Sequence, residues 1–300
     1  MGMNQISRAF YELKFKDYIR EKNGTEFEDF FSKIMKAKHQ ENFISCKPWG
    51  REGDRKNDGY LMSERHLFAV NGPETLNQSR MLNKINDDFN GALSHWGIYF
   101  NKWSFVHNQD ALPPQIVEKI ISLNEQHSGK IHINHWDPNK LKSIIFELDD
   151  TLVDEILGPI PSERDYTEIG FKDIQPVINA ISRRATPTEE NFMPVPENKL
   201  YINGLSDPII ELIRCGFKRA TLVTRYFNMQ TNITMGDEIE NTLKLEYEKL
   251  KNQHLPPDDI YNGLCSFIRD EEKKDDNIYQ VAVHTVLAYY FEQCTIFEGV

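Results

Sequence analysis

The sequence is poor in cysteine and lacks a long apolar run. Four cysteines are scattered through 300 residues without a Cys-x-x-C pair, which argues against a disulfide framework and against a thiolate zinc site. The most apolar stretch, residues 281–291, is interrupted by His284 and is too short to span a bilayer. The N-terminus also lacks the pattern of a secretory signal peptide. We therefore expect free thiols, no membrane insertion and a cytoplasmic protein.

The chain also lacks an excess of positive charge, since 35 Lys and Arg residues face 46 Asp and Glu residues. Most of the deficit lies in residues 162–300, which carry 15 basic against 23 acidic side chains, whereas residues 1–161 carry 20 against 23. A broad phosphate-binding surface needs concentrated Lys and Arg. Any nucleic acid is therefore expected to meet the first part of the chain.

Hydrophobic periodicity divides the chain into two parts, and its length allows two cores of ordinary size. Residues 1–161 are predicted to form an α/β domain with the core order α-β-β-β-α-β, and residues 162–300 an all-α domain. The expected core elements are a helix from Thr25, strands at 43–46, 59–62 and 66–70, a helix at 77–96 and a strand at 103–107. A helix at 7–19 precedes them, and a helix at 115–125, a strand at 131–136 and a helix at 139–148 follow. The all-α domain is expected to hold helices at 172–183, 208–215, 236–251, 258–269 and 277–293, the last of them buried at its centre.

Two carboxylates stand out in the first part. Hydrolysis of a phosphodiester with Mg²⁺ needs two or three carboxylates for the metal and commonly a lysine beside the attacking water. Glu28 lies on the rim of the apolar stripe of its helix, and Asp58 opens the second strand. Each also has a structural explanation, because Thr25 and Glu28 form a capping-box pattern and Asn57-Asp58-Gly59 suits a turn.

A basic loop precedes Asp58. Residues 50–56 hold three basic side chains and two glycines, a composition that lets the main chain approach a phosphate backbone. A solvated loop without a ligand is the alternative interpretation. The candidate DNA contacts around this loop are Lys47, Trp49, Arg51, Arg55 and Lys56.

The same stretch resembles the restriction-endonuclease-like superfamily, in particular the Mrr-like branch of the PD-(D/E)xK nucleases. The similarity is carried by Phe27-Glu28, by Gly50 with Gly53-Asp54, and by Asn57-Asp58-Gly59. It implies that Glu28 and Asp58 bind Mg²⁺, with Asn71 as a third ligand on the next strand. The position of the family's catalytic lysine is occupied by Pro73, which has no amine, so Lys56 or Lys47 would have to replace it.

A second resemblance covers most of the chain. The segments GREGDRKNDGY, VNGPE, WSFVHN and VLAYYFEQCTIFEG are similar to the C-terminal-domain proteins of bacterial ABC three-component, or Lamassu-like, antiphage systems. The similarity implies partnership with an SMC-like ABC ATPase and a small middle component, with the helical domain docking those partners. Two functions follow: a defence effector with a divergent nuclease domain, or a non-catalytic adaptor that binds DNA or serves as a scaffold. The helical part also suggests self-association as an alternative to a protein partner.

Several other side chains are expected to be structural. His132 and His135 should point to opposite faces of one strand, so they cannot share a metal ion on their own. His284 is expected to be a hydrogen-bonded interior histidine. Trp96, Trp103 and Trp136 are expected in the core.

Overall fold

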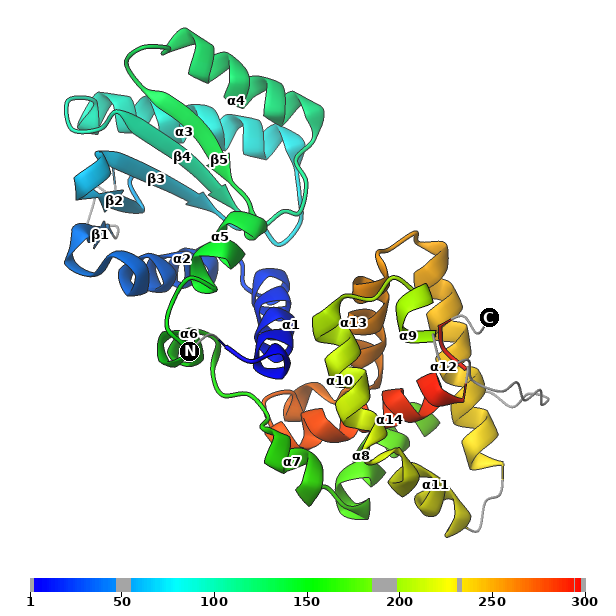
Figure 1. The fold of residues 1–300 in the computed structure, drawn as a ribbon. Coiled ribbons are helices and arrows are strands. Elements are labelled where there is room, and N and C mark those ends of the chain that lie inside the picture. The colour runs from blue at the N-terminus through cyan, green and yellow to red at the C-terminus, as the bar shows by residue number, and fades with distance from the viewer. Residues whose placement is uncertain (1–2, 47–54, 185–198, 231–233, 294, 298–300) are drawn as a thin grey trace. The chain divides into compact units, whose positions relative to one another are not determined.

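The computed structural model describes residues 3–46, 55–184, 199–230, 234–293 and 295–297 (Figure 1). Its contacts divide the chain into an α/β unit, residues 14–158, and a helical unit made of residues 1–13 and 159–300. The predicted boundary at residue 161 had placed residues 1–13 in the first domain. They belong with the helices because Ala9 and Phe10 of α1 (Gln5–Glu21) are buried in the helical core, where the Phe10 ring lies 5.2 Å from His284.

The α/β unit is built on a five-stranded mixed sheet with the spatial order β1-β2-β3-β4-β5. Its strands are β1 (Phe43–Ser45), β2 (Gly59–Leu61), β3 (His66–Asn71), β4 (Lys102–His107) and β5 (His132–Trp136). The first three strands pair antiparallel, and β3, β4 and β5 pair parallel. The carboxyl ends of β3 and β4 therefore meet at one edge of the sheet, where Asn71 is paired with His107.

Helices cover both faces of this sheet (Figure 1). The bounds of the helices in this unit are α2 (Gly24–His39), α3 (Gln78–Trp96), α4 (Pro114–Gln126), α5 (Pro138–Ile145) and α6 (Asp150–Leu157). On one face, Phe31 of α2 packs 5.3 Å from Phe68, between ring centres. On the other face, Phe89 of α3 packs 5.3 Å from Trp103. This alternation of faces follows from the period of two along each strand.

The predicted α-β-β-β-α-β core is confirmed, since α2-β1-β2-β3-α3-β4 reproduces it, and so is the division into an α/β part and a helical part. Kinship with the restriction endonucleases stays a prediction. The predicted start of α2 was wrong, because the N-cap is Asn23 and no side chain caps the helix there. The N–H of Gly24 donates instead to the carbonyl of Gly72 at 2.7 Å, so a tertiary contact takes the place of the capping box.

The helical unit packs around α14 (Asn277–Glu292), whose side chains are buried nearly all round. The other described helices are α7 (Glu163–Glu168), α8 (Phe171–Ser182), α9 (Lys199–Ile202), α10 (Asp207–Phe217), α11 (Ala220–Asn228), α12 (Met235–Asn252) and α13 (Pro257–Ile268). His284 is an interior residue bonded to the Tyr261 hydroxyl at 2.8 Å, as predicted. Within the described ranges, no helix has the length and apolar character needed to cross a membrane.

Candidate functional site

The elements that carry the predicted metal ligands meet at one edge of the sheet. The register pairs Gly59 with Phe68, so the start of β2 lies beside the end of β3 and brings Asp58 and Asn71 to the same edge. The first turn of α2 reaches the end of β3 as well, because Gly72 offers no side chain. A Cβ there would lie 2.6 Å from atoms of the Phe27 side chain. Glu28 follows Phe27 directly on that helix.

Asp58 has a defined structural partner at this edge. Its Oδ2 atom accepts a hydrogen bond from the backbone N–H of Val70 at 2.6 Å, which ties the start of β2 to β3. A carboxylate has a second oxygen, so this bond and coordination of a cation are compatible.

The donor chemistry of this edge suits a hard cation. Glu28, Asp58 and Asn71 are all half-buried and offer oxygen ligands, and Mg²⁺ commonly uses one or two carboxylates together with water. Among the residues that the structure describes, however, no group of three His, Cys, Asp or Glu side chains is arranged to hold a metal. Any metal site at this edge would therefore draw fewer than three such ligands from the described residues.

Lys56, one of the two lysines expected to replace the one missing at Pro73, is engaged elsewhere. The Lys56 amine lies 3.0 Å from Oδ1 of Asp88, and the Lys84 amine lies 2.6 Å from Oδ2 of the same carboxylate. Asp88 belongs to α3, and its side chain is only 2% exposed. Lys56 is thus held against α3, where it helps to neutralise a buried charge. The Lys84–Asp88 spacing of four residues was the one sequence signal for this cluster.

The structure describes only the end of the predicted basic loop. Lys47, Trp49 and Arg51 lie outside the described residues. Arg55 is exposed, and its carbonyl accepts a hydrogen bond from Nε1 of Trp96 at 3.1 Å. Trp96 is partly exposed and hydrogen-bonded to this loop. The expectation that it lies in the core was wrong.

A histidine pair lies next to this edge of the sheet. The rings of His107 and His135 stack with their centres 5.3 Å apart, and Nε2 of His107 lies 3.0 Å from Nδ1 of His135. Burial, and secondarily the neighbouring His135, lowers the pKa of His107 to about 4. His132 faces the other side of the sheet, as predicted, because it lines a groove with Trp136 there.

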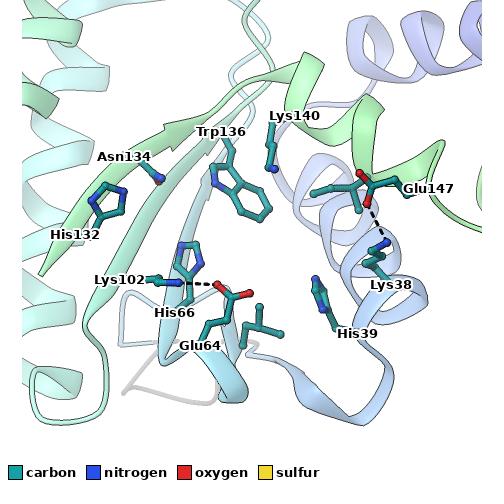
Figure 2. A pocket seen from close by; sticks show the side chains of 12 residues that line it. Lys38, His39, Glu64, His66, Lys102, His132, Asn134, Trp136, Lys140 and Glu147 are labelled. Atoms are coloured by element: carbon teal, nitrogen blue, oxygen red, sulfur yellow. Dashed lines mark hydrogen bonds and ion pairs between the residues drawn. The ribbon is translucent and has the colours of Figure 1, made fainter.

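That groove lies in the α/β unit and is lined largely by polar and charged side chains. It has a volume of about 370 Å³, begins at the first residues of β3, β4 and β5, and runs along β5 on the face covered by α2 and α5 (Figure 2). Its lining includes His66, Lys102, His132, Asn134 and Trp136 from the strands. The turn before β3, the end of α2, and α5 with the segment after it add Glu64, Lys38, His39, Lys140 and Glu147.

Two ion pairs flank the groove (Figure 2). Lys102 lies 2.9 Å from Glu64, and Lys38 lies 2.9 Å from Glu147. The hydrogen bond from the lysine lowers the pKa of each glutamate, so both carboxylates are ionised at neutral pH.

His66 begins a chain of hydrogen bonds inside the groove. Its Nε2 atom lies 2.7 Å from the hydroxyl of Ser104, which in turn donates to Asn134 Oδ1. Burial lowers the pKa of His66 to about 4, so the imidazole is neutral at pH 7. Trp136 meets His66 edge-on, with the ring centres 5.6 Å apart, and is half-buried. Of the three tryptophans that were expected in the core, only Trp103 is fully buried.

Comparison with known families gives a match in the helical unit. Residues 172–298 match the family described as C-terminal domain 10 of the ABC-three component (ABC-3C) systems. The match spans α8 to the end of the helical unit, which is less than half of the chain, and it supports membership of such a multi-component system. Comparison with curated proteins and with solved structures gives no significant match.

Proposed function

We propose that this chain is the DNA-engaging subunit of an ABC-3C antiphage defence system and acts in the cytoplasm. The observation that carries the proposal is the match of residues 172–298 to the C-terminal domain of these systems. The α/β unit that precedes this domain supplies a separate core with its own surfaces. A two-unit chain of this kind suits a subunit that joins a partner to a second target.

In this proposal the helical unit docks an SMC-like ABC ATPase and a small middle component. Its strong negative charge disfavours nucleic acid, which leaves protein as the better partner. We expect the full chain to elute with the ATPase in size-exclusion chromatography when the two are co-expressed. Separate elution of the two proteins, or a self-assembled form of this chain that excludes the ATPase, would count against the docking role.

DNA engagement is assigned to the α/β unit and its basic loop. Arg51→Glu combined with Arg55→Glu is expected to weaken binding to duplex DNA and to flatten its salt dependence, because binding through fewer phosphate contacts releases fewer counterions from the DNA. Fluorescence anisotropy at two salt concentrations measures both effects. The matched control is Lys119→Glu with Lys130→Glu, which changes the net charge equally on and just after α4. Equal weakening in the two double variants would show a general charge effect and refute contact by the loop.

A second candidate function is Mg²⁺-dependent cleavage at the edge that holds Asp58 and Asn71, with Glu28 as the other carboxylate. Its support is the placement of the three residues on elements that meet there. Bound Mg²⁺ would supply a charge that stabilises the phosphate undergoing attack. The engagement of Lys56 by Asp88 and the absence of an amine at Pro73 favour the adaptor without catalysis.

The variant Asp58→Asn separates the two functions. The amide oxygen can still accept the Val70 hydrogen bond, so folding should be preserved while the metal-binding charge is lost. If the protein with its partners and Mg²⁺ cleaves duplex DNA, this variant should lose cleavage and the exposed control Asp87→Asn should retain it. DNA that is bound but left intact by the unaltered protein would establish the adaptor.

A further inference from the structure

The groove along β5 has no part in the function proposed above, yet it combines an aromatic ring with several amines. We propose that it binds a nucleobase together with its adjacent phosphate, either in a free mononucleotide or at the end of a single-stranded nucleic acid. The inference is independent of the basic loop and of the edge that holds Asp58.

Trp136 is the stacking platform. Its ring is held by edge contacts with three neighbours on the same face of the sheet: Phe68 at 4.9 Å, His66 at 5.6 Å and Phe31 at 6.4 Å between ring centres. These contacts orient the indole while leaving it half-exposed in the groove (Figure 2). Bases stack readily on such a fixed aromatic face, because every base has a flat π surface.

Lys140 is the amine best placed for a phosphate. Its Nζ lies 5.5 Å from the centre of the Trp136 ring, over the ring. Lys38 and Lys102, by contrast, are already bound to Glu147 and Glu64. A base that stacks on Trp136 would displace the ammonium from the ring toward the phosphate carried by the sugar attached to that base. The exchange is favourable because an ion pair with a phosphate replaces an exposed cation–π contact.

The charge balance of the groove fits one small anion. Three lysines and two glutamates line it, and burial lowers the pKa of both His39 and His66 below the usual histidine value. The lysines exceed the glutamates by one charge, and these two imidazoles add none to it at neutral pH. The carboxylates of Glu64 and Glu147 are also acceptors for the amino and ring N–H groups of a base.

The volume limits the size of the ligand. About 370 Å³ is at the lower end of the range for small-molecule sites, roughly 300–1,000 Å³. A nucleotide fits such a volume, whereas a duplex does not enter it. The groove therefore takes a single base and its phosphate.

Isothermal titration of the full-length protein tests the proposal. The probes are AMP, GMP, CMP and UMP, then adenosine and inorganic phosphate as the separate halves of the ligand, and a short single-stranded oligothymidine with a terminal phosphate. We expect at least one mononucleotide or the oligonucleotide to bind, and adenosine and phosphate alone to bind more weakly. Binding of mononucleotides identifies a free nucleotide as the ligand, and binding of the oligonucleotide alone identifies a strand end.

Two variants and one control assign the binding to the groove. Lys140→Gln should weaken the Kd about tenfold, the loss expected for one charge-assisted contact, and Trp136→Leu should weaken it while keeping an apolar side chain in place. Lys142→Gln, two residues along the same helix and outside the groove lining, should leave the Kd unchanged. The urea midpoint of each variant verifies that it is folded.

The proposal is overturned if none of the probes binds, or if Lys140→Gln and Lys142→Gln give the same Kd. Its failure is distinguishable from failure of the proposed DNA engagement. Lys140→Gln is expected to leave the affinity for duplex DNA unchanged, whereas the loop variants Arg51→Glu and Arg55→Glu should weaken duplex binding and leave nucleotide binding intact.

Discussion

Replacing Asp88 with asparagine should destabilise the α/β unit. The Asp88 side chain is only 2% exposed and is shared by the amines of Lys56 at 3.0 Å and Lys84 at 2.6 Å. Asparagine has nearly the same shape, so Asp88→Asn removes the charge with little change in packing. Two ammonium groups then lose the carboxylate that neutralises them.

The size of the effect follows from the geometry. At these separations and an effective dielectric constant of about 20, each pair has a Coulomb energy of about 5–6 kcal/mol. Most of this energy is offset, because the carboxylate was desolvated on burial and because the lysines, at 42% and 38% exposed, remain screened by water. We expect a net loss of about 1–3 kcal/mol in the free energy of unfolding.

Urea unfolding followed by tryptophan fluorescence measures this loss. Trp96 is a suitable reporter, since its Nε1 bonds to the Arg55 carbonyl beside Lys56. The matched control is Asp87→Asn, which removes an exposed charge from the neighbouring position of α3 and should change the free energy of unfolding by less than about 0.5 kcal/mol. If Asp88→Asn is as stable as Asp87→Asn, the cluster does not stabilise the fold and the reasoning fails.

Two further predictions concern buried histidines. The pKa of His66 is about 4 in the folded protein and near 6.5 in the unfolded chain. Between these two pH values the unfolded chain binds a proton that the folded protein does not, so the free energy of unfolding decreases as the pH is lowered. Urea unfolding at pH 7 and at pH 5 measures the decrease in the free energy of unfolding over this range. The decrease should be about 1–2 kcal/mol smaller for His66→Gln than for the unaltered protein, and equal decreases would contradict this prediction. Tyr261→Phe should lose about 1–3 kcal/mol because it removes the buried bond to His284. Tyr201→Phe, at a residue 62% exposed, is the control, and an equal loss there would contradict the assignment.

Much of the secondary structure could be predicted because its signals are local. The stripe that includes Phe27, Phe31 and Ile34 repeats at helical spacing, and all three are fully buried in α2. Short alternating or apolar runs likewise marked the five strands. The helices α6, α7, α9 and α11 were missed, because they are only eight, six, four and nine residues long and local periodicity is weak over so few turns.

The candidate sites were harder to predict, because their residues converge through pairing and packing. The start of α2 depends on a contact between Gly24 and Gly72, which are far apart in sequence, so the local capping pattern at Thr25 was misleading. Trp136 has the sequence context of a core residue, and only its position on the edge strand β5 leaves it partly exposed.

By itself the sequence determined the kinds of element, their order, the division into two units and the acidic character of the second, because side-chain periodicity and charge are properties of neighbouring residues. Only the tertiary structure decided that Lys56 forms an ion pair with Asp88. It also decided that Lys140 and Trp136 line the same groove as Glu64 and Lys102. Strand register and helix packing bring such groups within a few ångströms of one another. Both depend on contacts between residues far apart in the sequence, so the spacing of neighbouring residues does not predict them.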